Sequence, residues 1–242
     1  MLSSTVTVAT VTVEDNIAPT ALCQDITVQL DENGQGSITS FSQEQANSVN
    51  DWSSTQGQGG WSYGLYDPFQ YQSFSNLTWN GFVWHNPGVG QVLDFPQLDQ
   101  NGGHPAFDGK WAVRRWTSDY SGPVTVSGDF YDRDTGGGNG AHVRIFKNGV
   151  QVYEYLNIPG SSTNYSFNLD VSIGDLIDFA IDPIFTDAGN DDTHFTSTIS
   201  TQSVNNGSFD NCGIATIVVS DSTFTCAAVS YTHLTLPTNR EV

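Results

Sequence analysis

Two acidic stretches of this chain carry the residue types that hold a hard cation. The first, "DRDTGGGNG", places Asp132 and Asp134 two residues apart, ahead of three glycines and Asn139. The second, "DPIFTDAGNDDTHF", supplies Asp182, Asp187, Asn190, Asp191 and Asp192. Hard cations need several oxygen ligands on a tightly turning loop, and glycine lets main-chain carbonyls join them. If the two loops meet at one edge of the fold, the sequence predicts a shared Ca²⁺ site.

A simpler interpretation stays open for these aspartates, namely solvated turns. Gly136 stands where an EF-hand would have a third acidic or amide ligand, so that motif is excluded. Asp182 precedes Pro183, a position that also suits the capping of a turn.

Aromatic residues are dense early in the chain, and flat indole and phenol rings stack on the C–H faces of sugars. Those between residues 52 and 84 include Trp52, Trp61, Tyr63, Tyr66, Phe69, Tyr71, Trp79 and Trp84. Most should fill a core, because large rings are first of all packing material. We expect Trp61, Tyr63 and Trp84 to be exposed in glycine-rich loops and to bind a ligand.

Two further ligand candidates lie in short motifs, His104 in "GGHP" and Arg114 in "WAVRRW". The period of two in a strand places Arg114 and Arg115 on opposite faces. One arginine is expected to support the sheet among acids, and Arg114 to meet an anionic ligand group.

There is no G-x-S-x-G, H-E-x-x-H or P-loop motif, which favours a non-catalytic protein. Paired carboxylates keep glycoside hydrolysis open as a less favoured alternative.

Composition limits the partners and the compartment. The 242 residues include 26 acids against seven Lys and Arg, a formal charge of −19 that would repel nucleic acid. The sequence contains no apolar run of about 18 residues, the length that would predict a membrane-spanning helix. Three cysteines, one methionine and few lysines favour a secreted or cell-surface protein. The start has no signal sequence, so we expect a piece of a longer chain.

The middle of the chain predicts β-strands throughout and no amphipathic helix. The strand-like segments are "KWAVRRW", "GPVTVSGDFY", "AHVRIFKNGVQVYEY", "NYSFNLDVSI", "GDLIDFAID" and "THFTSTIS". In "KNG", Asn148 and Gly149 suit the positive φ angles of a tight hairpin. A two-sheet jelly-roll sandwich is the simplest architecture.

A near repeat divides the chain into a host and an inserted guest. "SVND" at residues 48–51 is echoed by "SVNN" at 203–206, and all six tryptophans lie between them. We predict the end of a preceding β module at 1–13, a host module at 14–50 plus 203–228, and an inserted module at 51–202. Loop tips tolerate insertions of this kind. Chance similarity of two polar tetrapeptides is the alternative.

Both modules resemble known types. "VTVEDNIAPTALCQDITVQLDENGQGSIT" and "NGSFDNCGIATIVVSDSTFTC" resemble the hyalin-repeat (HYR-like) immunoglobulin modules of bacterial surface proteins, but the usual last strands are missing. "TQGQGGWSYGLYD", "GGHP", the stretch from "WAVRRW" to "FKNGV", and "GDLIDFAIDP" followed by "DDTHFTSTI" resemble an uncharacterised jelly-roll module of environmental bacteria, similar in outline to galactose-binding-like sandwiches. The second resemblance implies a non-catalytic, glycan-associated module.

The flanks of the chain contain the three cysteines and a C-terminal stretch of different composition. Cys23, Cys212 and Cys226 all fall in the host, and their pairing stays open. The last residues, 229–242, contain "VSYTHLTLPT", which resembles the translation of a sequencing adapter; a genuine disordered tail is the alternative.

We therefore expect an all-β fold, a jelly-roll β-sandwich inserted in a partial immunoglobulin-like β-sandwich. The expected function is binding and adhesion in an exported bacterial multidomain protein, with extracellular polysaccharide and neighbouring modules of the same chain as partners and Ca²⁺ as support. A purely structural spacer of an adhesin and, third, a polysaccharide-active enzyme are the alternatives.

Overall fold

The computed structural model describes residues 20, 35–37, 42–67, 70–87, 95–134, 137–157, 162–202 and 223–225. Within these ranges the secondary structure is β-strand apart from one 3₁₀ turn at Gln58–Gly60, which confirms the predicted all-β class. The strands are β1 (Gln35–Ser37), β2 (Glu44–Asn47), β3 (Trp61–Asp67), β4 (Gln70–Asn76), β5 (Thr78–Trp79), β6 (Trp84–His85), β7 (Gln97–Asp99), β8 (Gly102–His104), β9 (Trp111–Thr117), β10 (Gly122–Asp132), β11 (Ala141–Lys147), β12 (Val150–Asn157), β13 (Ser162–Val171), β14 (Leu176–Asp182), β15 (Thr193–Phe195), β16 (Thr198–Thr201) and β17 (Thr223–Thr225). A helix able to span a bilayer is absent from the described ranges.

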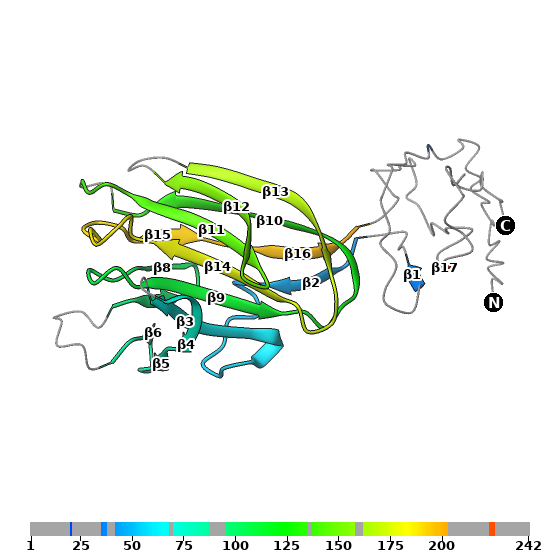
Figure 1. Ribbon diagram of the computed structural model, residues 1–242, viewed down its shortest axis with the longest axis horizontal. Coiled ribbons are helices and arrows are strands. Elements are labelled where there is room, and N and C mark those ends of the chain that lie inside the picture. The colour runs from blue at the N-terminus through cyan, green and yellow to red at the C-terminus, as the bar shows by residue number, and fades with distance from the viewer. Residues whose placement is uncertain are drawn as a thin grey trace, which may run out of the picture.

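Two antiparallel sheets form a sandwich, as Figure 1 shows. One sheet runs in the order β2-β16-β10-β15-β8-β7-β6-β5, with β13 also paired to β10, and the other in the order β12-β11-β14-β9-β3-β4. The chain repeatedly changes sheet, from β9 to β10, back to β11 and β12, across to β13, back to β14 and across again to β15. This is the connectivity of a jelly roll.

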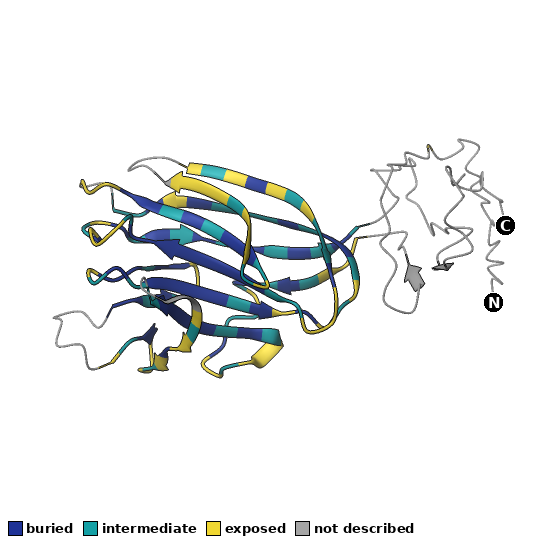
Figure 2. Cartoon of the chain, viewed as in Figure 1, coloured by how far each residue is buried: buried dark blue, intermediate teal, exposed yellow. Residues whose placement is uncertain are grey.

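The core lies between the sheets and follows from alternation along the strands. In β10, Val124, Val126 and Phe130 point inward and are fully buried, while Thr125 and Tyr131 point outward. Figure 2 shows the same contrast across the fold: β9 and β14 are buried almost throughout, whereas β12 and much of β13 are exposed. Burial of these apolar faces is the main force that holds the two sheets together.

The predicted hairpin at "KNG" is confirmed. β11 and β12 pair antiparallel from Lys147–Val150 outward. Asn148 (φ 49°) and Gly149 (φ 78°) both have the left-handed backbone that a two-residue turn of this type requires. The Asn148 side chain also donates to Asp175 (2.7 Å) and accepts from the Leu176 main chain (2.8 Å), which ties the hairpin to β14.

Strands that precede the predicted insertion pair with a strand near its end and with a strand beyond it. β2, which precedes the predicted joint at Asp51, is hydrogen bonded to β16 within the sandwich, and Ser48 and Ser197 exchange bonds of 2.8 and 2.9 Å. β1 and β17 form a two-stranded antiparallel sheet. The preceding module at 1–13, all three cysteines and the tail at 229–242 lie outside the described residues, and the division into host and guest stays a prediction.

Candidate functional site

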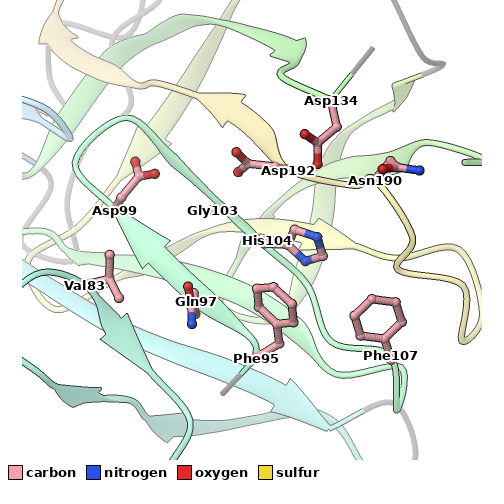
Figure 3. A pocket seen from close by; sticks show the side chains of 10 residues that line it. All are labelled: Val83, Phe95, Gln97, Asp99, Gly103, His104, Phe107, Asp134, Asn190 and Asp192. Carbon is pink, nitrogen blue, oxygen red and sulfur yellow. The ribbon is translucent and has the colours of Figure 1, made fainter. Parts of the chain in front are cut away.

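The β7–β8 hairpin builds a pocket of about 450 Å³ (Figure 3). The hairpin pairs with β15, and a Cβ added at Gly102 would lie 2.0 Å from the Thr193 carbonyl oxygen. Glycine at this position therefore lets β8 lie directly against β15. The lining comes from the hairpin and from the loops beside it: Val83, Phe95, Gln97, Asp99, Gly103, His104, Phe107, Asp134, Asn190 and Asp192.

One wall of the pocket is aromatic. The rings of Phe95 and His104 are stacked, with centroids 4.0 Å apart and planes 12° from parallel. Phe107 lies 5.8 Å from Phe95 and 6.1 Å from His104, and 43% of its surface is exposed. Figure 3 shows the three rings next to one another on the side of the pocket away from Asp192. This wall offers apolar ring surface to a ligand.

The facing wall is polar and holds two carboxylates on one arginine. Arg133 donates to Asp99 (2.5 and 3.0 Å) and to Asp192 (3.3 Å). Burial alone would raise the pKa of Asp99, but the bonds from Arg133 bring that pKa below its usual value. Burial raises the pKa of Asp192, and Arg133 opposes the rise. The arginine therefore fixes the position of both carboxylates.

Arg114 supports this hairpin from inside the core and does not line the pocket, which corrects its expected role. Its side chain is buried and donates to three main-chain carbonyls, those of Asp99, Gly102 (3.0 Å) and Phe195 (3.3 Å). Burial lowers the pKa of Arg114 to about 10. The predicted split of the two arginines between faces is confirmed, because Arg115 pairs with Asp178 (2.6 Å) on the other face of β9.

The expected exposure of Trp61, Tyr63 and Trp84 is wrong. They retain only 1%, 1% and 4% of their accessible surface and belong to the main core. Tyr63 stacks on Trp84 with centroids 5.1 Å apart, and the Trp84 indole donates to the carbonyl of Ser53 (3.0 Å). Trp61 and Tyr63 lie on β3 between the sheets, so the neighbouring glycines mark close packing and no open loop.

The two acidic loops meet, as the calcium hypothesis required. Asp132 at the end of β10 pairs with Thr193 at the start of β15, and the Arg133 amide donates to the Asp192 carbonyl (2.8 Å). A Cβ added at Gly138 would lie 2.2 Å from the carbonyl oxygen of Gly189. The glycine-rich loop after β10 therefore packs on the loop that precedes β15.

Asp191 is the buried centre of this meeting. Only 1% of its surface is exposed, and neither carboxylate oxygen has a hydrogen-bond partner among the described residues. Burial and, after it, four neighbouring carboxylates raise the pKa of Asp191 to about 8; these are Asp187, Asp132, Asp134 and Asp182. In the described ranges, no three His, Cys, Asp or Glu side chains are already positioned to hold a metal ion.

The predicted cation residues thus divide into groups. Asp192 faces the pocket and Arg133, and Asn139 is exposed. The other five are Asp191 and the four carboxylates that raise its pKa, of which Asp134 also lines the pocket.

Of the predicted ligand residues, His104 alone lines the pocket. Sequence reasoning missed Phe95, Asp99 and Phe107, which neighbour it only through the hairpin and the turn that follows. The one local signal was Phe107 in the turn "AFDG", an aromatic residue where turns are usually polar.

Comparison with known proteins adds little to this picture. The sequence matches no protein-family model and no curated protein. Among solved structures, the chain is similar to the native structure of a family 35 carbohydrate-binding module from Clostridium thermocellum, with 12% identity over 50% of this chain and 88% of that chain and a TM-score of 0.28. This likeness is too weak to bear on function.

Proposed function

We propose that the sandwich is a non-catalytic carbohydrate-binding module of an exported protein, and that the β7–β8 pocket holds the sugar. One observation carries the proposal: an exposed aromatic ring, Phe107, faces carboxylate and amide groups across a pocket of about 450 Å³. That volume lies within the range of small-molecule sites. Extracellular polysaccharide is the proposed partner.

The two walls suit the two kinds of surface on a pyranose ring. The axial C–H groups form an apolar face that packs on an aromatic ring, here Phe107 beside the Phe95–His104 stack. The ring hydroxyls donate hydrogen bonds, and ionised carboxylates such as Asp99 are strong acceptors. Because Arg133 already fixes Asp99, the Asp99 side chain loses little further conformational freedom when a sugar binds.

The charge of the pocket selects among sugars. Three carboxylates line it, those of Asp99, Asp134 and Asp192, and Arg133 pairs with two of them. The net charge is negative, on a chain whose formal charge is −19. Uronate-rich polymers would be repelled, so we propose neutral polysaccharides as ligands.

Affinity electrophoresis of the whole chain tests this function. The gels contain neutral glucans and galactomannans, with pectate and alginate as uronate-rich comparisons. Retardation by at least one neutral polymer, and by neither uronate polymer, is expected. Absence of retardation across the panel would favour the spacer role. Release of reducing ends from a retarding polymer would favour the enzyme.

A further inference from the structure

We propose that the two acidic loops bind one hard divalent cation, of the Ca²⁺ type, with the carboxylate of Asp191 as its central ligand. The site lies between the loop after β10, described at residues 133–134 and 137–140, and the loop before β15, residues 183–192. The same loops supply Asp134, Asn190 and Asp192 to the edge of the pocket, but the evidence for the cation site does not depend on sugar binding.

Asp191 is buried without a hydrogen-bond partner among the described residues. Only 1% of its surface is exposed, yet both carboxylate oxygens lack a hydrogen bond within the described residues. Burying an ionised carboxylate is costly unless it is paired, hydrogen bonded or bound to a metal. Proteins keep very few such groups, and each one requires an explanation.

The charges around Asp191 are mainly those of other carboxylates. Asp187, Asp132, Asp134 and Asp182 all act on Asp191 through space, and each of them disfavours its ionised form. Arg144 pairs with Asp182 (2.9 Å), which offsets one of these charges. A cation between the loops would turn the remaining repulsion into attraction, because a bound ion is usually the largest local charge.

Backbone contacts hold the two acidic loops in place. The Gly138–Gly189 approach brings the loop backbones together, and the Asp132 carboxylate accepts a 2.8 Å bond from the Asp134 amide within its own loop. Asp187 likewise accepts from the Gly189 amide (3.2 Å). The acidic side chains alone do not complete a ligand set. Calcium accepts carbonyl, amide and water oxygens, so the glycine-rich backbone supplies the kind of ligand that is lacking.

The test is thermal unfolding of the 242-residue chain after removal of metals, in millimolar CaCl₂ and in excess chelator. At about a hundred times Kd, a cation that binds only the folded state raises the Tm of a domain of this size by about 5 to 10 °C. The wild-type chain should show a rise of this order. An unchanged Tm in CaCl₂ would overturn the proposal.

Matched variants locate the effect. Asp191→Asn keeps the shape of the side chain and should abolish the CaCl₂-dependent rise, while Asp119→Asn, an equal charge change at an exposed position beyond the other end of β10, should keep it. A full rise in Asp191→Asn would overturn the assignment.

A calorimetric titration guards against a variant that does not fold. Asp187 is exposed, so Asp187→Asn leaves the core intact and should weaken CaCl₂ binding about tenfold, since affinity follows the ligand charge. Equal affinity in the Asp187→Asn and wild-type chains would contradict the site. These readouts are independent of saccharide binding.

Discussion

Arg133 holds Asp99 by two hydrogen bonds, of 2.5 and 3.0 Å, from its two terminal nitrogens. The bidentate pair joins the residue after β10 to the end of β7, and it presents the Asp99 carboxylate at the pocket. A paired fork of this kind fixes direction as well as position. The geometry of the polar wall therefore depends on one side chain.

Replacement of this arginine should weaken sugar binding more than it weakens the fold. Arg133→Lys keeps the charge but loses the planar fork. We expect a fall of about 1 kcal/mol or less in the free energy of unfolding, because the pair is partly exposed. Affinity for the retarding polysaccharide should fall about tenfold, with Arg133→Met at least as weak. Unchanged affinity in both variants would show that the pocket does not need a fixed Asp99.

The close contact of the acidic loops predicts a difference between two glycines with similar backbones. Gly138 (φ 84°) would meet the Gly189 carbonyl at 2.2 Å, whereas Gly174 (φ 88°) has open space around it. Gly138→Ala and Gly174→Ala carry similar backbone strain, so their difference isolates the clash. We expect Gly138→Ala to be the less stable by about 1 to 3 kcal/mol in chemical denaturation. Equal stabilities would mean that the loops are not in contact.

His194 predicts how stability changes with pH. It stacks on Tyr131, with centroids 4.3 Å apart, and lies 3.1 Å from Asp129. Burial lowers the pKa of His194 below 6.5, with Asp129 opposing the shift. Its contribution is therefore present above about pH 6.5 and is lost as the pH falls through the folded-state pKa. The stability advantage of wild type over His194→Gln should shrink from pH 7.5 to 5.5; a constant or growing advantage would contradict it.

The sequence predicted the strands well and the site poorly, for physical reasons. Alternation is a local property, so the faces of β9 and the turn at Asn148 and Gly149 followed from neighbouring residues alone. Exposure is not local. Gly60 and Gly64 suggested an open loop, but an added Cβ would lie 2.9 Å from the Thr117 carbonyl and 2.4 Å from the Phe74 ring.

The pocket escaped sequence analysis because it is assembled from distant segments. Arg133 meets Asp99 across 34 positions, and Phe95 stacks on His104 only because β7 and β8 form a hairpin. The sequence analysis named the meeting of the two acidic loops as the condition for a shared Ca²⁺ site. The burial of Asp191 was not predicted, because burial depends on how distant segments pack and not on neighbouring residues.

The most direct test of the central claim is calorimetric titration of the wild-type, Phe107→Ala and Ile173→Ala chains with the neutral polysaccharide that retards the protein. Both side chains are exposed, but Ile173 lies beyond the opposite end of β10 from the pocket. Loss of a stacking ring is worth about tenfold in affinity. The account predicts that loss for Phe107→Ala and none for Ile173→Ala, whereas wild-type affinity in Phe107→Ala would place the sugar elsewhere.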